Sequence, residues 1–88
     1  KMKVRYWSEE ATSSAKSDLQ HEHVHERREL IERLLKGEQI ESVINDAIAC
    51  IVTKKEHLIL GKSGMSGWDR YLDTGIRVYD SKEQVWCN

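Results

Sequence analysis

The stretch that decides the predicted fold is 17-SDLQHEHVHERRELIERLLK-36, which Gly37 follows directly. Ser17 and Gln20 stand at the spacing of a capping box, in which two side chains satisfy free backbone amides at the start of a helix. Gly37 is typical of the residue that follows the last turn of a helix. The sequence therefore predicts one long helix, from about residue 15 or 17 to Lys36.

A polar line divides the apolar face of this predicted helix. On a helical wheel of about 100° per residue, the face is formed by Leu19, Val24, Leu30, Ile31, Leu34 and Leu35. Its centre carries Lys16, Gln20, His23 and Arg27, in steps of four, three and four residues, so their side chains should be neighbours. We call these four residues the polar seam.

The polar seam is the candidate binding site of the sequence. A charged group that points into a core is costly unless it is paired. We therefore expect Arg27 to meet an internal acidic group or to reach past the edge of the core. The alternative is that Lys16, Gln20, His23 and Arg27 line a pocket for an anion or another small molecule.

The other patterns predict short elements. Apolar spacing predicts a helix over residues 38–48, and a capping box at Thr53–Glu56 opens another that runs to Leu60. One or two helical turns are expected over 68–72. Strands are expected over 2–7 and 49–52, and over 76–79 and 84–87 as a hairpin.

These elements predict a single α+β domain over residues 1–88. We expect a small, mostly antiparallel sheet, with the long helix and the Ile40–Ile48 helix packed on one face. A chain of 88 residues is long enough for one domain and too short for two. Its core must be small, so a partner surface would add stability.

Composition restricts the partners. The 14 basic and 15 acidic residues give a net charge of -1, which argues against nucleic-acid binding as a general property. No apolar run is long enough for a membrane span, and no signal-peptide pattern is found. Cys50 and Cys87 lie among apolar residues, which favours two buried thiols over a disulfide. We therefore expect a soluble, cytoplasmic protein without a membrane partner.

No cofactor or metal is predicted. His21 and His25 would be neighbours on the outer side of the long helix, a spacing that zinc can use. Two cysteines and this histidine pair do not supply four ligands at the usual spacing, so the histidines are expected to be ordinary surface residues.

The run Glu22-His23-Val24, with His57 much later in the chain, resembles the HNH endonuclease family. The resemblance covers less than half of the chain. It implies Glu22 or His21 as a metal ligand, His23 as the general base, Asn45 as the residue that orients the base, and His57 as a further ligand. A metal-dependent nuclease is thus an alternative function.

The sequence favours a binding or interaction domain without catalysis of its own, which forms a homo-oligomer, most simply a dimer. No catalytic residue is predicted. The metal-dependent nuclease and the anion pocket lined by the polar seam are the two alternatives.

Overall fold

The structure, a computed structural model, describes residues 4–87. Within these residues, five strands form one sheet: β1 Tyr6–Ser8, β2 Leu19–His23, β3 Ala49–Thr53, β4 Val78–Asp80 and β5 Val85–Trp86. The described part of the chain has four helices: α1 Arg27–Leu35, α2 Ile40–Asn45, α3 Lys54–Gly61 and α4 Asp69–Thr74. Two short 3-10 turns, η1 Ala11–Ser13 and η2 Lys16–Asp18, connect β1 to β2. The α+β class is therefore confirmed.

The sheet is mixed rather than mostly antiparallel, which corrects the prediction. Its strand order is β2-β3-β1-β4-β5. β1 runs parallel to β3, whereas the pairings β2–β3, β1–β4 and β4–β5 are antiparallel. β1 and β3 can run parallel because the long connection through β2, α1 and α2 separates them in the chain.

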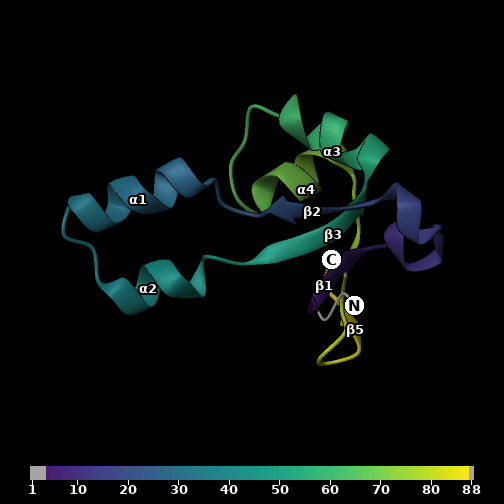
Figure 1. The fold of residues 1–88 in the computed structure, drawn as a ribbon, viewed down its shortest axis with the longest axis horizontal. Helices are drawn as coiled ribbons and strands as arrows, with labels where there is room; N and C mark the ends of the chain where they lie inside the picture. Colours follow the sequence, from purple (N-terminus) through teal and green to yellow (C-terminus); the bar gives the residue numbers. More distant parts are fainter. Residues whose placement is uncertain (1–3, 88) are drawn as a thin grey trace.

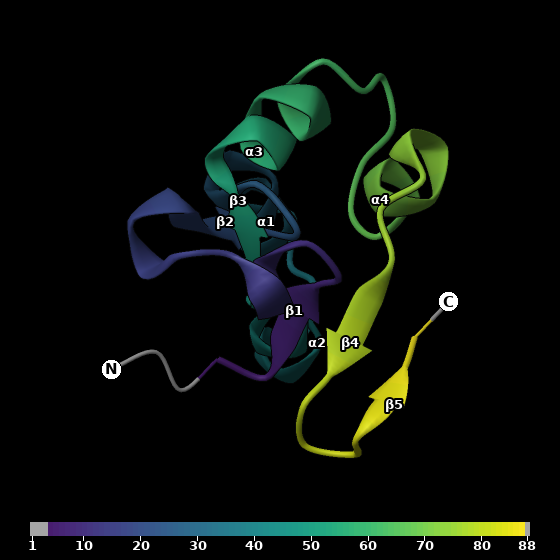
Figure 2. The ribbon, with the colours of Figure 1, turned by 90° about the vertical axis from the view of Figure 1, so that its right-hand side faces the viewer.

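The core lies between the sheet and the two helices α3 and α4 (Figures 1 and 2). Strands β3 and β4 contribute Cys50, Val52 and Val78, while α3 contributes Leu60 and α4 contributes Tyr71. The partly buried rings of Tyr6 and Trp68 pack against this cluster, with their centroids 5.1 Å apart. The helices that cover the sheet are thus α3 and α4, not the two helices for which the sequence predicted this role.

The predicted long helix is wrong in its first half. Residues 16–18 form η2, residues 19–23 form β2, and the helix itself begins only at Arg27. Gln20, Glu22 and Val24 alternate with the exposed His21 and His23, which is the period of a strand. The predicted capping box at Ser17 is therefore absent, whereas Gly37 does follow the helix, with φ 90°.

Helices α1 and α2 form a projecting arm, which we call the helical arm, residues 27–45 (Figure 1). It connects the antiparallel neighbours β2 and β3, so that it occupies the place of a hairpin loop. Leu30 of α1 and Val43 of α2 are its buried apolar residues. The predicted helix over 38–48 is confirmed as the shorter α2.

Most of the short predictions hold. β3 covers the predicted strand over 49–52, and the Thr53–Glu56 capping box opens α3 as expected. α4 begins one residue after the predicted start, and β4 with β5 forms the predicted hairpin. Tyr6 and Trp7 of the predicted first strand lie in β1, while residues 2 and 3 lie outside the described residues.

No helix within residues 4–87 has the length and apolar character that crossing a membrane requires.

Candidate functional site

The structure brings three of the four polar-seam residues together, although not on a helix. Gln20 and His23 lie on β2 and Arg27 begins α1, and all three line a hollow of about 590 Å³. The other lining residues are His21, Glu22, Glu26, Arg28 and His57. Lys16 lies in η2, is exposed, and does not line the hollow. We call this depression the β2 hollow.

The sequence predicted that Arg27 meets an internal acidic group or reaches past the edge of the core. In the part of the chain that the structure describes, it meets no internal acidic group. Its side chain is exposed, and no ion pair or hydrogen bond to it is found within residues 4–87. The expectation of a buried arginine depended on the continuous helix. Because β2 replaces the first half of that helix, the predicted apolar helix face with Arg27 at its centre does not form.

The floor of the β2 hollow contains a buried carboxylate, Glu22, with two partners. One oxygen, Oε1, lies 2.5 Å from Nδ1 of His57, and the other accepts a hydrogen bond of 3.0 Å from Arg70. Glu22 and Arg70 are each 8% exposed, whereas the His57 side chain is 41% exposed. The carboxylate thus joins β2 to α3 and α4 at one point.

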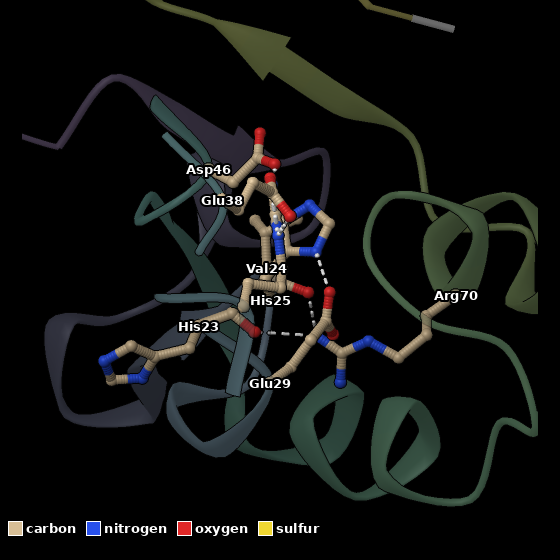
Figure 3. Close-up of polar contacts among 8 residues, drawn as sticks. His23, Val24, His25, Glu29, Glu38, Asp46 and Arg70 are labelled. Carbon is tan, nitrogen blue, oxygen red and sulfur yellow. Dashed lines mark hydrogen bonds and ion pairs between the residues drawn. The ribbon is translucent and has the colours of Figure 1, made fainter. Parts of the chain in front are cut away.

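Arg70 holds the end of β2 in place. Its Nη2 donates to the backbone carbonyls of His23 and Val24 at 2.7 and 3.0 Å, as the close-up shows (Figure 3). These carbonyls lie where β2 ends, between the strand and the helical arm. The guanidinium therefore fixes both Glu22 and the backbone that leads into α1.

His25 packs beside this point and does not form a helical pair with His21. Its Nδ1 lies 3.1 Å from Oε2 of Glu29 in α1 (Figure 3). A Cβ built on Gly67 would lie only 2.7 Å from Cε1 of the His25 ring, so the loop before α4 touches the imidazole closely. His21 lies on β2, where it is exposed.

The capping box explains why His57 reaches the hollow. Thr53 ends β3, and its hydroxyl accepts a hydrogen bond of 3.1 Å from the Glu56 amide. The Glu56 carboxylate in turn accepts from the Thr53 amide and from the Ser8 hydroxyl, at 2.9 and 2.5 Å. These contacts fix the first turn of α3, and with it the direction in which His57 leaves the helix.

The residues of the nuclease resemblance are only partly assembled. Glu22 and His57, which the resemblance implies as metal ligands, contact each other directly. His23 is exposed next to the buried Glu22, and Asn45 lies in α2 of the helical arm. Within residues 4–87, no three His, Cys, Asp or Glu side chains come close enough to hold a metal ion together.

The two cysteines differ. Cys50 is fully buried, and burial raises the pKa of its thiol to about 12, so its thiolate is strongly disfavoured. Cys87 is exposed, which corrects the expectation that both thiols are buried. Both are free thiols, and no disulfide joins them.

The helical arm carries a second candidate site. Five of its large apolar side chains are exposed: Ile31, Leu34, Leu35, Ile40 and Ile44. Leu35 is 81% exposed and Ile40 65%, although both belong to residue types that usually lie in a core. Arg33 ties the two helices together by pairing with Glu38 and, at 2.8 Å, with Asp46.

Sequence reasoning missed Arg70 entirely and did not pair Glu22 with His57. A signal for β2 was present, because Gln20, Glu22 and Val24 alternate with His21 and His23. It was hidden because two of the three inward positions are polar. No local pattern marks Arg70, which lies 48 residues after Glu22.

Comparisons with known proteins add nothing to this geometry: no family model, no curated protein and no solved structure matches the chain.

Proposed function

We propose that the protein is a binding domain that acts as a homodimer, in which the helical arms of two copies pack against each other. The observation that carries this proposal is the exposure of five large apolar side chains on the arm. A group of this kind on a soluble domain is typical of an interaction surface. Catalysis is not part of the proposal.

The helical arm needs further packing to be stable. α1 has nine residues and α2 has six, and helices of this length are marginal in water without tertiary contacts. Within the arm, the buried apolar residues are Leu30 and Val43. The ion pairs of Arg33 are partly exposed and therefore contribute little.

A second copy is the occupant that fits this surface best. Two antiparallel helices with exposed apolar residues form half of a four-helix bundle, and a second identical pair completes it. A two-fold axis places each apolar strip against its own equivalent, which is the commonest arrangement of homo-oligomers. The arm also carries charges of both signs, such as Arg28, Glu32, Lys36 and Glu41, so two copies need not repel each other.

The test is a change of charge on the arm. Ile31 and Leu35 are one helical turn apart and both exposed, so the double variant Ile31→Lys/Leu35→Lys should leave the fold of the monomer intact. We expect light scattering to give the dimer mass for the parent and the monomer mass for this variant. Leu58 on α3 is 66% exposed outside the arm, so Leu58→Lys is the matched control and should remain a dimer.

Two results would contradict the proposal. One is a parent protein that is monomeric at micromolar concentration. The other is dissociation by Leu58→Lys to the same extent as by the arm variant, since the interface would then lie elsewhere.

A cytoplasmic location is part of the proposal. Its support is the exposed free thiol of Cys87, a state that a reducing compartment maintains.

A further inference from the structure

We propose that the β2 hollow binds a phosphate group, held by Arg27 and Arg28 and by Nε2 of His57. This site does not use the apolar residues of the helical arm. It therefore stands or falls independently of the proposed dimer.

The contact with Glu22 sets the orientation of the His57 ring. An ionised carboxylate can only accept hydrogen bonds, so Nδ1 of His57 donates to Glu22 over 2.5 Å. This contact fixes which ring nitrogen carries the proton, as a carboxylate does for the histidines of many binding and catalytic sites. Nε2 is left for the hollow that His57 lines, and no partner for it is found among residues 4–87.

The charge of Glu22 is neutralised by Arg70. Arg70 lies against it at 3.0 Å, and both side chains are about 10% exposed. Arg70 also donates to two backbone carbonyls, so its structural role is complete without His57. The Glu22–Arg70 pair therefore does not need His57 for charge balance. The half-exposed His57 ring is available to present Nε2 to the hollow.

The rim of the β2 hollow carries a net positive charge. Arg27 and Arg28 both line the hollow, are exposed, and lack an ion pair within residues 4–87. By contrast, Arg5, Arg33 and Arg70 each contact a carboxylate at 3.0 Å or less. Because Arg70 balances Glu22, Glu26 is the acidic residue of the lining that opposes Arg27 and Arg28. The lining therefore has an excess of one positive charge even when its histidines are neutral.

The donors suit a phosphate. Guanidinium groups present parallel N–H donors whose spacing matches two oxygens of a phosphate. Nε2 of His57 complements them in either protonation state, because it accepts from a hydrogen phosphate or, once protonated, donates to a phosphate oxygen. Gln20, His21 and His23 supply further polar contacts around the same depression.

The size of the hollow admits more than a free anion. The depression of about 590 Å³ is open to solvent, so a phosphate bound in it can carry an organic group. The shared chemistry is the phosphate group, and its source is either inorganic phosphate or a phosphate monoester such as a nucleoside monophosphate.

The experiment is a titration of the protein with inorganic phosphate and, separately, with adenosine monophosphate at constant ionic strength. Ring-nitrogen NMR signals of His57 report the contact directly. We expect a saturable shift of the His57 Nε2 signal with at least one probe. Tighter binding of adenosine monophosphate identifies a monoester as the ligand class, whereas equal binding identifies the free anion.

Two variants and a control decide whether the contact is specific. Arg27→Gln/Arg28→Gln should weaken binding by about tenfold or more, because it removes two charge-assisted contacts. His57→Gln lacks the reporting imidazole, so its binding is compared with that of the parent by titration calorimetry. This substitution should weaken binding as well, with the fold maintained by Glu22 and Arg70. Lys36→Gln removes one exposed charge at the other end of α1 and should change nothing. The absence of a saturable shift with both probes, or equal weakening by Lys36→Gln, would overturn the proposal.

Discussion

Glu22 connects β2 to α3 and α4 through its two carboxylate oxygens. It occupies an inward position of β2, between Gln20 and Val24, where strands of this kind usually carry apolar residues. Its burial is possible because Arg70 and His57 each take one of its oxygens. A buried charge is costly without a partner, so Glu22 depends on Arg70 for its charge balance, while His57 satisfies its other oxygen.

The first prediction concerns this dependence. Arg70→Met leaves Glu22 buried beside His57 alone and removes the donors to the carbonyls of His23 and Val24. We expect the free energy of unfolding to fall by about 3–5 kcal/mol in urea titrations. Adding Glu22→Gln to Arg70→Met should recover part of this loss, because the orphaned charge disappears. Equal stability of the single and double variants would show that the unpaired charge of Glu22 does not cause the loss.

A second prediction concerns Asp80 and pH. Both of its oxygens accept hydrogen bonds from Arg5, at 2.7 and 2.6 Å, and this pairing holds the pKa of the Asp80 carboxyl down at about 2. The unfolded chain has an aspartate pKa of about 3.9. A lowered pKa stabilises the folded state above the unfolded value, and this stabilisation is lost as pH falls towards the folded value.

The measurement is urea unfolding at several pH values between 5 and 2. We expect the stability difference between the parent and Asp80→Asn to be constant above about pH 4 and to shrink below it. Asp18→Asn alters an exposed aspartate without a partner within residues 4–87 and serves as the control. A constant difference across the whole range would mean that Asp80 keeps no lowered pKa in solution.

At the scale of elements, the contact between the loop before α4 and the start of α1 depends on Gly67. Its φ of 58° lies in the left-handed region, and an added Cβ would meet Cε1 of His25 at 2.7 Å. The ring of His25 is itself held by Glu29 of α1. The glycine thus allows α4, and with it Arg70, to lie close to the end of β2.

The third prediction follows from this contact. Gly67→Ala should destabilise the protein by about 1–3 kcal/mol, through backbone strain and the clash with His25. Gly61, the last residue of α3, has no positive φ, and a Cβ added there would meet no atom within 4 Å apart from its chain neighbours and its own helix backbone. Gly61→Ala should therefore be neutral or stabilising. Thermal unfolding compares the two. His25→Ala should recover part of the loss in Gly67→Ala, and no recovery would mean that the clash is not its cause.

At the scale of the whole molecule, the helical arm and the sheet differ in how much apolar surface they enclose. The sheet with α3 and α4 encloses the core cluster, whereas the arm extends the molecule to 40 Å along its longest axis (Figure 1). The arm encloses little apolar surface by itself. A dimer joined through the arms would therefore couple the stability of this region to protein concentration.

The fourth prediction uses that coupling. Because dissociation accompanies unfolding of a dimer, the Tm should rise with protein concentration. The arm variant Ile31→Lys/Leu35→Lys should unfold at a temperature that does not depend on concentration. Calorimetry over a hundredfold range of concentration would show both effects. A parent Tm that is independent of concentration would contradict the dimer even if its mass in light scattering were ambiguous.

The sequence by itself determined those elements whose cause is local. Thr53 and Glu56 cap α3 through contacts between residues three apart, and Gly37 ends α1 because glycine readily adopts a positive φ. The apolar run of β3 and the hairpin of β4 and β5 also follow from local patterns. Such signals need no knowledge of the rest of the chain.

Tertiary contacts decided the identity of β2, because the local signal for a strand is weak. The segment 19–25 fits a helix by its spacing, and its inward residues Gln20 and Glu22 do not resemble those of a buried strand. Pairing with β3 along five residue pairs, together with Arg70 reaching Glu22 from 48 residues away, selects the strand instead. The β2 hollow follows from that choice, because it brings Gln20, His23 and Arg27 beside His57. The physical reason is that backbone pairing and charge neutralisation over long distances in the chain outweigh a weak local preference for helix.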